Sequence, residues 1–233
     1  MDYRHELKYV VTASQLALLE NRIRNLVALD SHVGQEGMYR IRSLYFDDYY
    51  HSCYIENEIG TDPREKFRIR IYNGDAGRIS LELKKKEHGM TRKLSCRLTK
   101  EQCRELMAGR CLPWDESYPP ILKKLNLLMQ TRGVRPKVIV EYDRVPYVDK
   151  LGNTRITVDR NIMSSDDIAG FLNPEIQRRP IMEAGRHILE VKYDEYLPDY
   201  ISRNLQLQTL RQTAFSKYYL CRRYRLYKTM GGI

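Results

Sequence analysis

Residues 65–87, EKFRIRIYNGDAGRISLELKKKE, alternate apolar and charged side chains along almost their whole length. Successive side chains of a β-strand point to opposite faces, so Phe67 and Ile69 share one face while Arg68 and Arg70 share the other. Glycines interrupt the alternation in the middle of the stretch, which is a hairpin signal. The pattern predicts two strands, 65–73 and 78–87, joined by a turn at 74–77.

Patterns with a period of two or of 3.6 residues recur along the rest of the chain. The period of two predicts further strands at 4–11, 38–47, 90–98, 136–148, 154–162 and 186–194. Helical spacing predicts helices at 13–28, 99–109, 119–131, 197–209 and 214–228, with Thr12 or Ser14 capping the first and Thr99 the second. Residues 164–185 are expected to be irregular. About eight strands with helices at the ends and in the middle indicate an α+β fold whose sheet could close into a barrel.

Most of the expected strands carry one apolar stripe and one charged stripe, and basic residues dominate the charged stripe. A single strand of this kind is typical of a sheet that exposes its charged face to water. The repeated pairs of basic residues, such as Arg40 with Arg42, favour a different interpretation. If the amphipathic helices cover the apolar face from outside, the charged faces look inward and a closed sheet encloses a basic channel.

Composition supports an anionic partner without selecting one. The 233 residues carry 40 Lys and Arg against 30 Asp and Glu, a net charge of +10. Such a chain attracts nucleic acid, acidic membrane surfaces or phosphorylated small molecules. Five cysteines without a CxxC pair argue against a zinc site or a disulfide framework and fit a reducing cytosol. The first ten residues show no signal peptide, and no apolar run is long enough to span a membrane.

A polyanion would resolve the repulsion inside a basic channel, because arginine binds phosphate oxygens in bidentate fashion and lysine acts as a point charge. The acids on the same faces suit a different task. They are expected to bind Mg²⁺ or Mn²⁺ that bridges phosphate oxygens, or to orient the basic groups. These acids are Glu6, Glu82, Asp159 and Glu190.

The motifs HELKY, YRIRSLYFDD, REKFRIRIY, ISLELKKK, VEYDR, RITVDR, ILEVKY and FSKYYL follow one another along nearly the whole chain. In this order they resemble the catalytic domain of the vacuolar transporter chaperone (VTC) proteins, polyphosphate polymerases of the triphosphate tunnel metalloenzyme superfamily. The resemblance implies a single domain over residues 1–233. It also implies a closed antiparallel eight-stranded β-barrel, the triphosphate tunnel, flanked by helices.

The resemblance also implies site residues. The expected catalytic groups are Lys8, Arg68, Arg70, Lys84, Lys93, Arg144, Arg155 and Lys217, with Arg92 and Arg97 close enough to Lys93 to confuse the alignment. Tyr142 and Ser216 are expected to bind substrate, although Tyr142 could be a core tyrosine and Ser216 could cap the last helix. The family's metal-binding glutamate matches Glu190. From the charged stripes we add Lys192 and Arg42 to the substrate-binding set, and Glu82 and Glu6 to the metal set.

The implied activity is a manganese- or magnesium-dependent phosphotransferase of the polyphosphate kinase type. It would transfer the γ-phosphate of ATP, or of another nucleoside triphosphate, to inorganic polyphosphate. We expect a prokaryotic, cytoplasmic protein that binds phosphate compounds, does not bind nucleic acid and has no membrane span, with association with membrane partners left open. Two alternatives remain at this stage: a tripolyphosphatase or nucleoside triphosphatase on the same tunnel, and a non-catalytic module that binds polyphosphate or nucleic acid.

Overall fold

A computed structural model describes residues 3–31, 33–34 and 36–229 of the chain. The chain divides into two compact units. The first unit comprises Met1–Arg40, Tyr142–Ile162 and Met182–Phe215, and the second comprises Ile41–Glu141, Met163–Ile181 and Ser216–Ile233. Three strands, β3 (Tyr39–Asp47), β7 (Arg135–Asp149) and β8 (Thr154–Ser165), contribute residues to both units.

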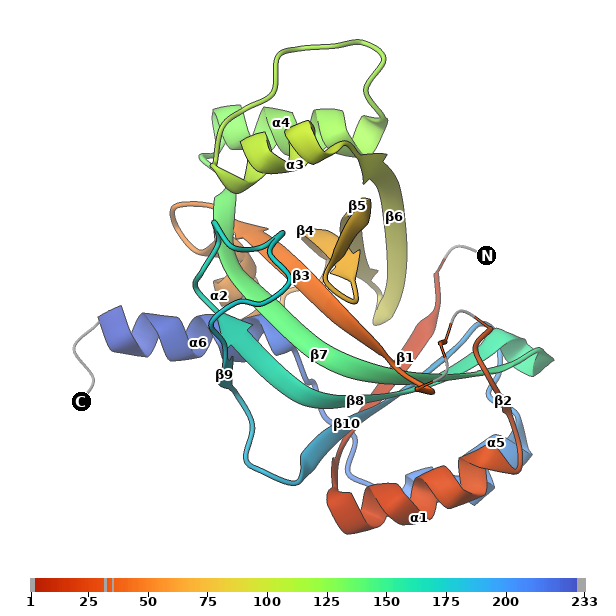
Figure 1. Cartoon of the computed structure of the whole chain (residues 1–233). Helices are drawn as coiled ribbons and strands as arrows, with labels where there is room; N and C mark the ends of the chain where they lie inside the picture. The colour runs from red at the N-terminus through yellow and green to blue at the C-terminus, as the bar shows by residue number, and fades with distance from the viewer. Residues whose placement is uncertain (1–2, 32, 35, 230–233) are drawn as a thin grey trace. The chain divides into compact units, whose positions relative to one another are not determined.

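The strands of the first unit place their apolar stripes against helices. Strand β1 (His5–Thr12) pairs antiparallel with β10 (Arg186–Tyr193), and β10 pairs antiparallel with β8. Side chains of these strands, such as Val11, Val158 and Leu189, form one apolar core with α1 (Ala13–Arg24) and α5 (Asp199–Asn204). Figure 1 shows α1 beside α5 in this unit. The opposite face of β1 and β10 therefore carries the charged stripe.

The second unit repeats the arrangement with other elements. Strands β3, β4 (Arg64–Tyr72), β5 (Asp75–Glu87) and β6 (Met90–Leu98) pair in sequence, each antiparallel to the next. Their apolar side chains pack in a second core with α3 (Lys100–Met107) and α4 (Pro120–Thr131), which lie together at one side of this unit in Figure 1. The predicted sidedness of the strands is confirmed within each unit, with one correction. Arg42, expected on the charged stripe, lies opposite Ile71 on the apolar face of β3 and is fully buried.

The expected closed barrel is wrong. Eight strands pair in the order β1-β10-β8-β7-β3-β4-β5-β6, and among the described residues this path has two ends rather than a closing pair. The outer edge of β1 is already occupied by the segment after α5: Thr213 N–H donates to the Lys8 carbonyl at 2.9 Å, and Tyr9 forms a β-bridge with Gln212. At Lys8 and Tyr9 the outer edge of β1 therefore already has backbone partners. The α+β class and the eight main strands are as predicted.

Local differences from the predicted elements have local causes. The β4–β5 turn is the dipeptide Asn73-Gly74 rather than residues 74–77, because both residues adopt positive φ (52° and 69°), the conformation of a two-residue hairpin turn. Helix α1 is capped by Thr12 and Gln15 in a capping box and ends at Arg24, before the short strand β2 (Ala28–Leu29) that pairs with β7.

Several further boundaries are corrected. The expected helix 197–209 is shortened to α5 and followed by a 3₁₀ turn, Leu207–Thr209. Helix α6 runs from Lys217 to Thr229. Helix α2 (Ser52–Glu58) was not predicted, and the expected irregular region contains the two-residue strand β9 (Arg179–Pro180). Within the described residues, none of the helices is both long and apolar enough to cross a membrane.

Candidate functional site: two clusters of charged side chains

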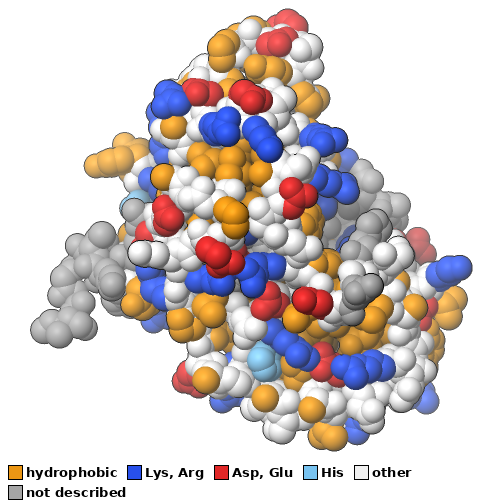
Figure 2. All heavy atoms as spheres, viewed as in Figure 1, with side chains coloured by type: hydrophobic (Ala, Val, Ile, Leu, Met, Phe, Trp, Pro, Cys, Tyr) orange, Lys and Arg blue, Asp and Glu red, His pale blue; other side chains and the backbone are white. Residues whose placement is uncertain are grey.

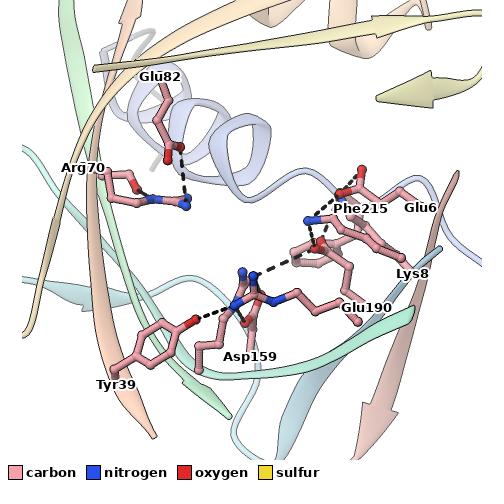
Figure 3. Close-up of polar contacts among 12 residues, drawn as sticks. Glu6, Lys8, Tyr39, Arg70, Glu82, Asp159, Glu190 and Phe215 are labelled. Carbon is pink, nitrogen blue, oxygen red and sulfur yellow. Dashed lines mark hydrogen bonds and ion pairs between the residues drawn. The ribbon is translucent and has the colours of Figure 1, made fainter. Parts of the chain in front are cut away.

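In the first unit, two lysines and two glutamates form a closed ring of ion pairs. Glu6 and Lys8 alternate on β1, Glu190 and Lys192 alternate on β10, and the antiparallel register sets Glu6 opposite Lys192 and Lys8 opposite Glu190. Lys8 Nζ lies 3.4 Å from Glu6 Oε2 and 3.6 Å from Glu190 Oε2, and Lys192 Nζ lies 3.4 Å from Glu6 Oε1 and 2.5 Å from Glu190 Oε1. Figure 3 shows Lys8 pointing toward both glutamates. The ring as a whole is neutral.

A buried arginine extends this ring. Arg144 on β7 donates hydrogen bonds of 2.7 and 2.8 Å to the Asp159 carboxylate, and its Nη2 lies 4.0 Å from Glu190 Oε1. Burial alone would lower the pKa of Arg144, but Asp159, Tyr142 and Glu190 raise it well above its usual value. The guanidinium lies 5.3 Å from the Tyr142 ring centroid, a cation–π contact. Tyr142 is itself buried, as the core interpretation of this residue expects.

Lys8 also contacts the chain segment that precedes α6. Its Nζ donates a hydrogen bond of 3.1 Å to the Phe215 carbonyl. We name the group Glu6, Lys8, Arg144, Asp159, Glu190 and Lys192 the ion-pair ring. Arg155, which the register sets opposite Lys192, donates to the Asp30 carboxylate at 2.9 Å and to the Tyr39 hydroxyl at 3.2 Å. Its expected role in holding phosphate stays a prediction.

In the second unit, the Glu82 carboxylate forms ion pairs with three cationic side chains. Arg68 Nε on β4 donates a hydrogen bond of 2.7 Å to Glu82 Oε2 on β5. Arg68 Nη2 lies 2.6 Å from the same oxygen. Arg70 Nη1 lies 3.5 Å from the same oxygen, and Lys93 Nζ lies 3.3 Å from Oε1. A dashed line in Figure 3 marks the contact between Arg70 and Glu82. Burial by itself raises the pKa of Glu82, but the three cations outweigh it and hold this pKa well below its usual range. We name Arg68, Arg70, Glu82 and Lys93 the Glu82 cluster.

Three lysines lie in one row beside this cluster. The register places Lys66 of β4 opposite Lys84 of β5, and Lys84 opposite Lys93 of β6. Like charges directly opposite one another on a sheet are destabilising. Lys66 is steadied by Asn57, 2.5 Å away, and by the Tyr218 ring, 5.1 Å away. This face of the second unit therefore has an excess of positive charge.

Other predicted residues lie elsewhere in the second unit. The Arg42 side chain is fully buried and donates to Glu141 and to the carbonyls of Phe171, Asn173 and Pro174. Arg178, which the sequence did not single out, contacts the same Glu141. Because Arg42 has its donors directed at these acceptors, the structure gives it a role in holding residues 171–174. Its expected role in binding substrate remains a prediction.

Ser216 and Lys217 lie at the start of α6. Tyr219 N–H donates to Ser216 Oγ at 3.3 Å, so Ser216 caps this helix, as the alternative interpretation of this residue expects. A phosphate contact of Ser216 stays a prediction. Two side chains that the sequence did not indicate also belong to this unit's charged face: Tyr45 accepts a hydrogen bond from Arg68, and Ser43 accepts one from Arg70.

A model of the VTC domain family matches residues 3–224. The chain belongs to the VTC domain family. This VTC chain matches none of the curated proteins compared with it. Two solved structures are similar in fold: the PH1819 protein of Pyrococcus horikoshii, and a putative adenylyl cyclase of Hippeastrum described as having a dominant triphosphatase activity.

These likenesses are remote in sequence. The first structure is 14% identical, with a TM-score of 0.50, and the match covers 96% of this chain and 100% of the other. The second is 12% identical, with a TM-score of 0.51, and the match covers 96% of each chain. At such identities the similarity shows the fold alone.

The resemblance implies a divalent metal ion, and the two clusters differ in how well they fit one. Among the described residues no three His, Cys, Asp or Glu side chains come together as a metal site. Mg²⁺ is often bound by one or two carboxylates while substrate phosphates supply further ligands. Glu6 and Glu190, which contact the same two ammonium groups, fit that requirement. Glu82 is a lone carboxylate among Arg68, Arg70 and Lys93, so it fits a divalent ion less well than the pair of carboxylates Glu6 and Glu190.

Proposed function

We propose that the chain is a metal-dependent phosphotransferase that transfers the γ-phosphate of ATP to inorganic polyphosphate. The observation that supports this most strongly is the excess of cations on the charged face of the second unit. Arg68, Arg70 and Lys93 surround the single carboxylate Glu82, and Lys66 and Lys84 lie in one row with Lys93. Membership of the VTC domain family supports the same activity.

Each cluster receives a task in this proposal. Arg68 and Arg70 are held by Glu82 in a fixed orientation, ready to bind phosphate oxygens in the bidentate manner of guanidinium groups. The lysine row offsets the remaining charge of a polyanion. Glu82 thus orients cations and is not assigned to the metal.

The ion-pair ring is assigned to the metal. Glu6 and Glu190 would hold Mg²⁺ or Mn²⁺, which when bound would neutralise charge on the transferring phosphate. Lys8 and Lys192, now paired with these carboxylates, would become available to phosphate oxygens. Catalysis by this chain would rest on positioning and electrostatic stabilisation, as is usual in phosphoryl transfer.

The direct test incubates the protein with ATP and Mn²⁺ and separates the products on a gel. Long phosphate chains are the expected product. Arg70→Ala is expected to slow the reaction by about 10²–10³-fold, the usual effect of removing a preorganised charge donor. Glu190→Gln is expected to abolish the Mn²⁺-dependent activity. Glu183→Gln, at an exposed acid of the same unit, is the matched control and should retain this activity. Activity that is unchanged in Glu190→Gln would contradict the catalytic proposal.

A second candidate is hydrolysis of triphosphate with water as the acceptor. The similar Hippeastrum structure is described by its dominant triphosphatase activity, and the fold is compatible with both reactions. Release of orthophosphate without long chains in the same gel assay would select hydrolysis. A nucleic-acid module has less support, because the face in Figure 2 mixes basic and acidic side chains instead of presenting one basic stripe.

A further inference from the structure

Tyr45 on β3 lies beside Arg68, a residue of the second unit to which we assign phosphate binding. The register sets Tyr45 opposite Arg68, and Arg68 opposite Glu82, in one row across three strands. The neighbours of Tyr45 along β3, Leu44 and Phe46, belong to the apolar core. Tyr45 therefore projects from the charged face of the sheet.

The contact between Arg68 and Tyr45 determines whether the Tyr45 hydroxyl can donate or accept a further hydrogen bond. Arg68 Nη1 lies 2.8 Å from Tyr45 Oη. Because a guanidinium group only donates, the phenol oxygen must be the acceptor in this bond. The phenol hydrogen remains for another acceptor, and within the described part of the chain no side chain or carbonyl accepts it. The hydroxyl is thus an oriented donor next to a cation.

The ring of Tyr45 is held in place from behind. It packs against Tyr218 of α6, with ring centroids 5.1 Å apart and an interplanar angle of 38°. Tyr218 is anchored in turn by a hydrogen bond from its hydroxyl to the buried Asp47 carboxylate. Both tyrosines are almost fully buried, so the phenol has little freedom to leave its position. A donor fixed in this way loses little entropy when it binds a ligand.

We propose that the Tyr45 hydroxyl donates a hydrogen bond to an oxygen of the phosphate group that Arg68 binds. This inference rests on the proposed function, because it requires a triphosphate or polyphosphate on the Glu82 cluster. The neutral hydroxyl adds a directional contact to a site otherwise made of charges. A hydrogen bond to a charged acceptor contributes about 1.5–3 kcal/mol, so its loss should weaken binding about 10- to 100-fold.

The test measures binding of inorganic tripolyphosphate in EDTA by calorimetry, which needs no turnover and no metal. Tyr45→Phe keeps the ring against Tyr218 and removes only the hydroxyl, and it should bind at least about tenfold more weakly than the unchanged protein. Tyr54→Phe, at a tyrosine of the same unit that stacks on Tyr219, is the matched control and should bind normally. Thermal unfolding of each variant checks that the fold is retained.

The Arg68→Ala background separates direct contact from positioning. If Tyr45 touches phosphate, Tyr45→Phe still weakens binding when Arg68 is absent. If Tyr45 only orients Arg68, the second change has no further effect, and the inference is overturned. Normal binding by Tyr45→Phe alone also overturns it but leaves the proposed function intact. Normal binding by Arg68→Ala would instead remove the proposed function of the cluster.

Discussion

Arg144 on β7 donates two hydrogen bonds, of 2.7 and 2.8 Å, to both oxygens of Asp159 on β8. Asp159 is fully buried and Arg144 is 8% exposed, so neither charge can be satisfied by water when the other is removed. Removing one partner of a buried ion pair leaves an uncompensated buried charge. The free-energy cost of that charge exceeds the net stabilisation that the intact pair provided. This pair is linked to the other residues of the ion-pair ring by the contact between Arg144 and Glu190.

Asp159→Asn is therefore expected to lower the free energy of unfolding by about 3–5 kcal/mol. Urea denaturation at neutral pH measures the change. The matched control is Asp199→Asn, which breaks an exposed pair with Arg203 and should cost less than about 1 kcal/mol. Equal losses in the two variants would show that Arg144 is stabilised by groups other than Asp159.

The Glu82 cluster predicts a dependence of stability on acid. Burial opposes ionisation of Glu82, but Arg68, Arg70 and Lys93 outweigh burial and lower its pKa in the folded state. A carboxylate with a lowered folded pKa contributes stability that is present above its unfolded pKa, about 4.3, and is lost as pH falls toward the folded pKa. The loss should therefore begin near pH 4 and continue below it.

Comparison with Glu82→Gln isolates this contribution. The variant should be less stable than the unchanged protein at pH 7, by roughly 3 kcal/mol, and the difference should shrink as the pH falls below about 4. Denaturation curves at a series of pH values provide the measurement. Glu105→Gln, at an exposed glutamate paired with Arg110, is the control and should show little change. A difference that stays constant down to pH 2 would contradict the assigned cause.

The sidedness of the strands could be predicted from the sequence because it depends only on alternation within each strand. Ile69 and Leu81 had to share a face with their apolar neighbours, and both lie in the core of the second unit. The same alternation placed Arg68 and Glu82 on the opposite face. Their contact needed only the hairpin between them, which is a local signal.

The features that sequence reasoning missed depend on long-range pairing or on weak local signals. The ion-pair ring requires β1 to lie beside β10, strands separated by most of the chain, and no local pattern fixes that register. The pairing of Gln212 and Thr213 with the edge of β1 is likewise long-range, and the sequence did not indicate it. Helix α2 lacks apolar residues at helical spacing, and none of its residues is buried.

The ion-pair ring also predicts competition between an internal ammonium group and a metal ion. Lys192 Nζ lies 2.5 Å from Glu190 Oε1 and 3.4 Å from Glu6 Oε1, so it offsets part of the negative charge of the two carboxylates that we assign to the metal. Lys192→Met removes this positive charge while preserving the aliphatic stem. The free protein should then bind Mn²⁺ about tenfold more tightly, a change of roughly 1.4 kcal/mol in binding free energy.

Titration of the free Mn²⁺ signal by electron paramagnetic resonance measures this affinity without substrate or turnover. Lys85→Met is the matched control, because Lys85 pairs with Glu65 at a partly exposed site of the other unit. Its removal should leave Mn²⁺ affinity unchanged. Tighter binding in Lys192→Met that disappears when Glu190→Gln is added would tie the gain to this carboxylate. Weaker or unchanged binding in Lys192→Met would mean that the ring is not where the metal competes.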